Sequence, residues 1–359
     1  MTKRGWILFG ALGVIWGTPY LLIRISVRDI SPPTLVFFRT AAAGILFLPV
    51  LVRAHNFGLL VRHWRPLVVY TVIEVAVPWL LLSRAEQRLT SSLSGLLIAT
   101  VPLIAVVLSW TTRHEGAPGW RRLAGLVLGF GGVAVIVGVD VHRSDVLAFL
   151  EVLVVAACYA VGPFVVVIRL AEVPAIATVG ASLILTGVGY APVGLTHLPG
   201  QLSPEEITSV VLLIVFCTAI AFLVYFALIA EVGPARATVI TYVNPAVAVM
   251  LGVLILHEPF STGLAAGVPL VFLGSFLGTR GSAGLADRGG SGRATTSGAP
   301  KGARPAHRRS EACDGPSGPG ATRSVGRVLP WSRSRRSPSE TRPHCGSGWG
   351  SWSTAAPPG

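Results

Sequence analysis

Charged side chains are scarce in this sequence. Only 13% of its 359 residues are Asp, Glu, Lys or Arg, whereas a soluble domain carries about 25%. So few charges cannot cover the surface of a soluble protein of this size, and 52% of the residues are hydrophobic. The composition therefore predicts that lipid surrounds most of the chain.

The sequence also lacks the short motifs of common soluble enzymes. It contains no Walker A segment, no GxSxG and no HExxH, and these motifs mark phosphate loops, serine nucleophiles and zinc sites. Its four cysteines form no CxxC pair. The only aspartates before residue 281 are Asp29, Asp140 and Asp145, all at loops. We expect no cofactor, no metal ion and no ATP-driven pump.

Ten apolar runs fill residues 1–280. Each is close to the length of about 20 residues that a helix needs to cross a hydrocarbon core. The loops between the runs are short and carry Pro, Gly or charge. We predict an all-α integral membrane protein with ten transmembrane helices, over residues 5–23, 33–53, 66–84, 90–111, 120–140, 146–168, 175–198, 207–230, 234–257 and 260–279.

The sequence repeats itself with a constant offset. The numbers of Pro102 and Pro245 differ by 143 (245 − 102), and so do those of Glu115 and Glu258 (258 − 115). The same shift aligns the first span with the sixth. A constant offset over this length indicates an internal duplication, so we expect two repeats of five spans each.

The predicted repeats are residues 1–140 and 141–280. Because five spans is an odd number, the second repeat must be inverted in the membrane relative to the first, as in many secondary transporters. Lys and Arg number eleven in one set of alternate loops and five in the other, and the richer set faces the cytoplasm. We expect a multi-pass protein of the cell membrane with both termini cytoplasmic, the Glu115 turn inside and the Glu258 turn outside.

The composition changes after residue 280. Residues 281–359 contain 15 glycines, 9 prolines and 12 of the 29 Lys and Arg. Such a segment cannot bury enough apolar surface to offset the entropy lost on ordering, so we predict a disordered basic tail. Either anionic lipid attracts it, or it has no specific role. Because this tail holds most of the net charge of +13, we expect no nucleic-acid partner.

Several motifs carry a family resemblance. The first span contains Trp-Gly-Thr-Pro-Tyr, the fourth and ninth spans each contain a proline and end at a glutamate, and glycine-rich spans follow both. In these features the chain resembles the EamA-type branch of the drug/metabolite transporter superfamily over about residues 5–279. The residues that carry the resemblance are Trp16 to Tyr20, Arg24, Pro32, Pro33, Arg39, Pro102, Glu115, Pro245 and Glu258.

The resemblance implies a ten-span inverted-repeat fold that exports or exchanges small organic metabolites or drugs through a central cavity. It names no substrate, coupling ion or oligomeric state. The second repeat departs from the pattern, because Tyr159 and Ala160 stand where the first repeat has Trp16 and Gly17. Two other functions stay open: an integral-membrane enzyme acting on lipid-linked substrates, and a non-transporting membrane scaffold.

Two ionisable residues lie deep within predicted spans. At a rise of about 1.5 Å per residue, Glu74 lies about 12 Å from the cytoplasmic end of the third span, and Arg39 about 9 Å from the outer end of the second. A charge at such depth costs at least ~2.5–3.5 kcal/mol, so it should face a cavity or a partner. Either they serve a substrate or proton site, with Glu74 as the proton-coupling candidate, or they form a structural pair.

Aromatic and amide side chains complete the candidate site. Trp16 and Tyr159 are repeat-related and lie within spans. Asn244 precedes a proline that should free a backbone carbonyl within the ninth span, which is tolerated where backbone lines a cavity. The candidate substrate-binding residues are Trp16, Tyr20, Arg39, Glu74, Trp79, Tyr159, Tyr242 and Asn244, whereas Pro102, Glu115, Pro245 and Glu258 are assigned to the structural motif.

Overall fold

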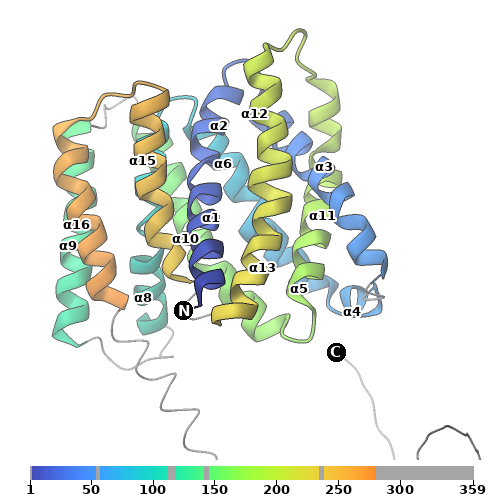
Figure 1. Ribbon diagram of the computed structural model, residues 1–359, viewed down its shortest axis with the longest axis horizontal. Coiled ribbons are helices and arrows are strands. Elements are labelled where there is room, and N and C mark those ends of the chain that lie inside the picture. The colour runs from blue at the N-terminus through green and yellow to red at the C-terminus, as the bar shows by residue number, and fades with distance from the viewer. Residues whose placement is uncertain (1, 54–56, 112–118, 141–144, 234–237, 280–359) are drawn as a thin grey trace, which may run out of the picture. The chain divides into compact units, whose positions relative to one another are not determined.

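The structure is a computed structural model. It describes residues 2–53, 57–111, 119–140, 145–233 and 238–279. Within these residues every element is a helix (Figure 1), which confirms the predicted all-α class. Glu115 and the predicted tail lie outside the described residues.

The first half of the chain forms helices at the positions of the first five predicted spans. Several spans consist of consecutive shorter helices. The elements are α1 (Lys3–Gly17), α2 (Pro19–Ser26), α3 (Pro32–Arg53), α4 (Phe57–Arg62), α5 (Trp64–Tyr70), the π-helical turn η1 (Thr71–Ala76), α6 (Val77–Ala85), α7 (Ser91–Ile98), α8 (Val101–Thr111) and α9 (Trp120–Asp140).

The second half forms helices at the positions of the last five predicted spans. The elements are α10 (Val146–Arg169), α11 (Ala175–Thr196), α12 (Pro204–Ile214), the π-helical turn η3 (Val215–Ile220), α13 (Ala221–Val232), the 3₁₀ helix η4 (Thr238–Tyr242), α15 (Val243–Ile255) and α16 (Thr262–Thr279).

Among the described residues, seven helical segments are long and apolar enough to cross a membrane. Two shorter apolar helices and α9 accompany them. The predicted count of ten spans therefore stays a prediction. The seven segments are Lys3–Ser26, Pro32–Arg53, Trp64–Ala85, Ser91–Thr111, Val146–Arg169, Ala175–Thr196 and Pro204–Val232.

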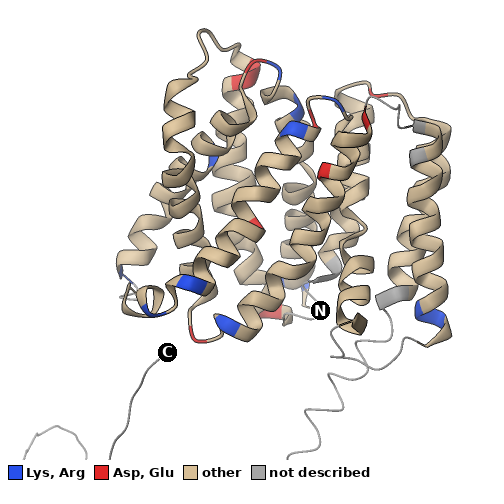
Figure 2. Cartoon of the chain, turned by 180° about the vertical axis from the view of Figure 1, so that it is seen from behind, with Lys and Arg blue, Asp and Glu red and all other residues tan. Residues whose placement is uncertain are grey.

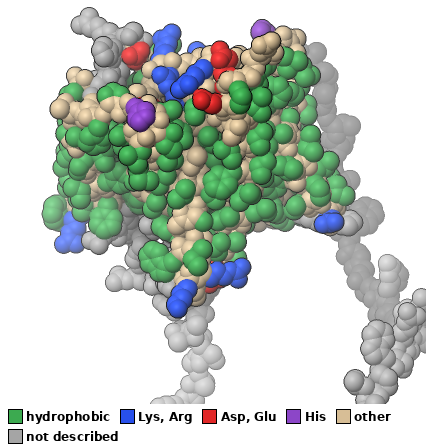
Figure 3. Space-filling view, turned by 45° about the horizontal axis from the view of Figure 1, so that its top comes forward, with side chains coloured by type: hydrophobic (Ala, Val, Ile, Leu, Met, Phe, Trp, Pro, Cys, Tyr) green, Lys and Arg blue, Asp and Glu red, His purple; other side chains and the backbone are tan. Residues whose placement is uncertain are grey.

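The outer faces of the helices carry large apolar side chains. Val61, Val167 and Val188 are exposed over 70%, 73% and 68% of their surfaces. Figure 3 shows hydrophobic side chains covering the visible face, with charged groups gathered toward its two ends, and Figure 2 shows most Lys, Arg, Asp and Glu near the helix ends. Apolar exposure of this extent is unfavourable in water and suits a lipid surrounding.

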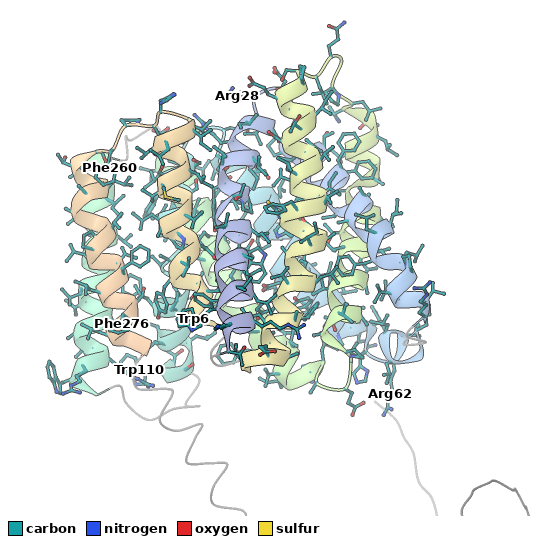
Figure 4. The ribbon with its side chains drawn as sticks, viewed as in Figure 1. Trp6, Arg28, Arg62, Trp110, Phe260 and Phe276 are labelled. Atoms are coloured by element: carbon teal, nitrogen blue, oxygen red, sulfur yellow. The ribbon has the colours of Figure 1, made fainter. Side chains whose placement is uncertain are left out.

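The described chain starts and finishes on one side of the helices. Trp6 in α1 and Phe276 in α16 lie toward the end that also holds Trp110, whereas Arg28 and Phe260 lie toward the opposite end (Figure 4). The ten crossings predicted from the sequence would require this arrangement.

Helix boundaries recur with the offset found in the sequence. α10 begins at Val146 and α1 at Lys3, so their first residues differ by 143 in number (146 − 3). α11 (175–196) follows α3 (32–53) with the same shift at both ends, since 175 − 32 and 196 − 53 are both 143. The two halves therefore build matching helices.

Glycines allow α9 and α16 to pack backbone against backbone. A Cβ atom placed on Gly274 would collide with the backbone of Gly129 and would lie 2.6 Å from the carbonyl oxygen of Gly125. Small residues commonly permit such close approach of helices in lipid, where burial from water no longer drives association.

Gly274→Ala is expected to destabilise the protein by about 1–3 kcal/mol, because the added methyl group presses on backbone that cannot rotate away. Thermal unfolding in detergent measures the effect. Gly131→Ala on α9 is the matched control, since a Cβ atom there meets nothing within 4 Å. Equal unfolding temperatures for the two variants would show that α9 and α16 do not pack this closely.

Candidate functional site

A π-helical turn positions Glu74. η1 interrupts the third span between α5 and α6, and such turns occur frequently at functional sites because the extra residue redirects neighbouring side chains. Glu74 packs onto α10, where a Cβ atom on Gly162 would collide with its Oε2 atom. Glycine at position 162 therefore leaves room for the carboxyl group. The segment Pro204–Val232 contains a comparable π-helical turn, η3. Its first residue differs from that of η1 by 144 in number (215 − 71), which is close to the repeat offset.

One oxygen of the Glu74 carboxyl group has no polar partner among the described residues. Its Oε2 atom is buried and has no hydrogen-bond partner among the described residues. Its electrostatic neighbours include the phenols of Tyr70, Tyr159 and Tyr225. A buried polar atom left without a hydrogen bond costs about 1–3 kcal/mol, and more when charged. A proton or a donor group of a ligand would remove that cost.

Arg39 extends from α3 and is held by neutral groups. Its Nε atom donates a hydrogen bond to Oγ1 of Thr218 in η3 (3.0 Å), and its guanidinium lies 3.7 Å from the ring centroid of Trp79. Only 8% of Arg39 is exposed. A desolvated cation–π contact of this kind contributes about 2 kcal/mol or more. The ring and the hydroxyl therefore hold the guanidinium without neutralising its charge.

Arg39 and Glu74 do not form the structural pair that the sequence left open. Among the described residues, the ion pairs lie at helix ends, as between Arg84 and Glu151 (3.1 Å). The reason is that Arg39 reaches η3 and Trp79, whereas Glu74 faces Gly162 on α10. Neither residue therefore has an ionic partner within the part of the chain that the structure describes.

Aromatic rings connect the two charged groups. Tyr159 on α10 interacts with Glu74 and with Trp79. Ring centroids of Trp16 and Tyr225 are 4.8 Å apart, and Tyr20 is buried close to Arg39. The structure thus brings six of the eight candidates together, and we call them the central cluster: Trp16, Tyr20, Arg39, Glu74, Trp79 and Tyr159.

The other two candidates lie at the junction of η4 and α15. The hydroxyl of Tyr242 donates to the backbone carbonyl of Ser275 in α16 (3.0 Å), so this phenol is tied to the α16 backbone. Oδ1 of Asn244 is buried without a hydrogen-bond partner among the described residues. The backbone oxygen of Asn244 would lie 3.0 Å from a Cβ atom on Gly17, which places Asn244 beside the break between α1 and α2.

The motif prolines stand at helix starts rather than within helices. Pro102 is the second residue of α8 and Pro245 the third of α15. Backbone N–H groups in a first turn have no helical partner, so Pro245 frees no carbonyl in the middle of a helix, contrary to the expectation from an unbroken helix over 234–257. The helix break in the first repeat corresponds to one in the second. Ala99 lies in the break between α7 and α8, and Tyr242, at the end of η4, is 143 residues later (242 − 99), which is the repeat offset.

Glu258 joins the two halves of the chain. Its carboxylate accepts hydrogen bonds from the backbone N–H groups of Ser91 (2.7 Å) and Ser92 (2.9 Å) and from the Ser92 hydroxyl (2.5 Å). These serines open α7, so the negative charge lies at the positive end of a helix dipole. Gly252 leaves the space, because a Cβ atom there would collide with the carboxylate.

Glu86 and Thr218 lie in or beside the site but were not predicted from the sequence. Glu86 stands in the polar segment Arg-Ala-Glu-Gln-Arg and resembles a loop residue, yet none of its surface is exposed. Thr218 lies within an apolar run and carries no charge. The duplication offers one signal for Thr218, since it occupies the same place in its π-helical turn as Glu74 does, at the shift of 144 (218 − 74) that relates the two turns.

The sequence profile of the EamA-like transporter family matches residues 3–138 and again residues 146–280. The chain is 32% identical over 293 residues to the "Uncharacterized inner membrane transporter YedA" of Escherichia coli (strain K12), covering 75% of this chain and 92% of the relative. It is 25% identical over 283 residues to an "Uncharacterized transporter" of Archaeoglobus fulgidus, covering 77% and 99%. A solved structure titled "Crystal structure of protein" shares the fold, with TM-score 0.54 and 19% identity over 78% of this chain and 98% of the other.

Proposed function

The chain belongs to the EamA-like transporter family, and from this premise we propose that it is a secondary transporter. It moves small organic metabolites or drugs across the cell membrane by alternating access, as an exporter or an exchanger. The central cluster carries the proposal, because it holds a carboxyl group with one buried, unpaired oxygen and a buried guanidinium among aromatic rings. Within the described part of the chain, neither group has an ionic partner. Charges kept this way inside a membrane protein mark solute or proton pathways.

Two inverted repeats, residues 1–140 and 141–280, supply the moving parts in this proposal. The recurring helix boundaries and the two matches of the family profile support it. The matched π-helical turns support it as well, because each contributes a polar residue, Glu74 or Thr218, to one region. Repeats of this kind exchange conformations around a fixed central site.

The roles of the cluster residues follow from their chemistry. The Nε atom of Arg39 donates a hydrogen bond to Thr218. The terminal N–H groups of the guanidinium suit an anionic or carbonyl group of the solute. The rings of Trp16 and Tyr159 suit an apolar or aromatic part. Glu74 binds and releases the proton that couples solute movement to a pH gradient.

A thermal-shift screen against metabolites and drugs tests whether the cluster binds a solute. A ligand that binds the folded form raises the free energy of unfolding, by about 2.7 kcal/mol when its concentration is 100 times its Kd, and so raises the unfolding temperature. We expect Arg39→Gln to abolish the shift and Arg84→Gln, at an exposed helix end, to keep it. A ligand whose shift is unaffected by Arg39→Gln would place binding elsewhere. Turnover of lipid-linked donors would favour the enzyme alternative, and the scaffold alternative predicts no ligand.

The topology is tested with single cysteines in a protein whose four native cysteines are replaced. Glu205→Cys, at the start of α12, should react with an impermeant reagent added outside the cell, and Glu172→Cys, between α10 and α11, should not. Both side chains are exposed, so burial does not limit labelling. The eleven-to-five distribution of Lys and Arg is the reason for this orientation. Labelling of both cysteines from the same side would exclude the proposed topology.

A further inference from the structure

Glu86 is a fully buried carboxyl group outside the central cluster. It follows α6 directly and has 0% of its surface exposed. Neither Oε1 nor Oε2 has a hydrogen-bond partner among the described residues. An ionised carboxylate normally accepts several hydrogen bonds or pairs with a cation when it is buried. Its place in the fold therefore requires a bound partner or a neutral form.

The charged groups around Glu86 leave its carboxyl group without a direct contact. Arg24 of α2 donates to the backbone carbonyl oxygen of Glu86 and forms no ion pair with its side chain. Arg39 of α3 is held by Thr218 and a tryptophan ring. Two further titratable groups among the described residues interact with Glu86: the phenol of Tyr20, on α2, and the carboxylate of Glu258, which follows α15.

The balance of these effects favours the neutral carboxyl group. Burial raises the pKa of Glu86 well above its usual range, and Arg24 opposes that rise. The negative charge of Glu258 also raises the pKa of Glu86, whereas the positive charge of Arg39 lowers it. The geometry agrees, because neither arginine reaches the carboxylate oxygens within ion-pair distance.

We propose that Glu86 is a second proton-binding site of this chain, separate from Glu74. Its complete burial leaves no room for an organic solute. A metal cation is disfavoured, because two arginines lie nearby and the oxygens of Glu258 already accept three hydrogen bonds. A proton needs neither space nor additional ligands.

The position of Glu86 suggests when it exchanges its proton. It follows Glu74 in the sequence by about 18 Å along a helix, at the end of the bundle where Glu258 caps α7. Opening the two halves at this end exposes Glu86 to water and lets it ionise, and closing restores the proton. This part rests on the proposed function, whereas proton binding itself is measured without any substrate.

The test is the pH dependence of thermal unfolding of the full-length, substrate-free protein and its Glu86→Gln variant. A raised pKa means that the folded state keeps the proton after the unfolded state loses it, near about pH 4.3. Wild-type stability therefore falls as pH rises from there through the folded-state pKa. As pH rises through that range, we expect the unfolding temperature of Glu86→Gln to increase steadily relative to that of wild type. The exposed control Glu205→Gln should show the same pH dependence as wild type. Parallel curves for wild type and Glu86→Gln would overturn the proposal.

A second measurement leaves Glu86 unchanged, in case Glu86→Gln does not fold. The infrared carbonyl band of a protonated carboxyl group should persist at neutral pH in the Glu74→Gln variant, because Glu86 supplies it. Absence of the band would overturn the proposal. Stabilisation by Na⁺ over K⁺ that disappears in a Glu86 variant would also overturn it, by showing that the site takes a metal cation. These outcomes do not depend on transport, so the proposed function can fail independently.

Discussion

Glu74→Gln is expected to abolish the accumulation of solute in vesicles driven by an imposed pH gradient, while solute exchange continues and becomes independent of pH. Glutamine keeps the shape of the side chain and resembles the protonated carboxyl group, so the variant can bind solute without carrying a proton. The expectation rests on a carboxyl group whose Oε2 is buried without a hydrogen-bond partner among the described residues. The exposed control Glu172→Gln should accumulate solute as wild type does.

A purely structural role for Glu74 makes a different prediction. It would lower the thermal stability of Glu74→Gln, and removing Arg39 as well would restore it if the two charges compensated each other. Because Arg39 contacts Thr218 and Trp79 instead, we expect that removing Arg39 does not restore the stability of Glu74→Gln. Gradient-driven accumulation by Glu74→Gln at the wild-type rate would exclude this residue as the proton carrier.

Glu258→Ala is expected to cost several kcal/mol of stability. The carboxylate accepts three hydrogen bonds at the start of α7, and a hydrogen bond to a charged group contributes about 1.5–3 kcal/mol. The substitution also leaves the N–H groups of Ser91 and Ser92 without their acceptor. Thermal unfolding in detergent measures the loss.

The matched control for this change is Glu231→Ala. Glu231 also stands at the end of a span, but it accepts an exposed hydrogen bond from Thr2 (2.5 Å), and exposed contacts contribute little. We expect Glu231→Ala to lower the free energy of unfolding by less than about 1 kcal/mol, because exposed contacts of this kind contribute little to stability. Equal losses of stability for Glu231→Ala and Glu258→Ala would show that the hydrogen bonds from Glu258 to α7 stabilise the protein no more than an exposed contact does.

The positions of the helices were predictable because each one needs a long apolar run. The first predicted span, 5–23, became Lys3–Ser26, and the second, 33–53, became Pro32–Arg53. The duplication was equally visible, since spacing along the chain carries over into helix boundaries. Composition and spacing thus account for most of the helical framework.

The breaks within spans were not predictable in the same way. Thr71–Ala76 and Val215–Ile220 become π-helical although their residues are ordinary for an α-helix, because packing against other helices decides how the backbone winds. Glu86 was missed for a related reason. Its neighbours in sequence are polar, and only the folded chain shows that it is fully buried near Arg24, Arg39 and Glu258.

The most direct test of the central claim uses the purified chain alone in sealed vesicles, with a solute found by the thermal-shift screen. We expect that an imposed pH gradient drives the solute to accumulate inside, and that collapsing the gradient with a proton ionophore releases it. A solute that binds the protein yet enters these vesicles no faster than it enters protein-free vesicles, with or without the gradient, would contradict the claim that the chain is a secondary transporter.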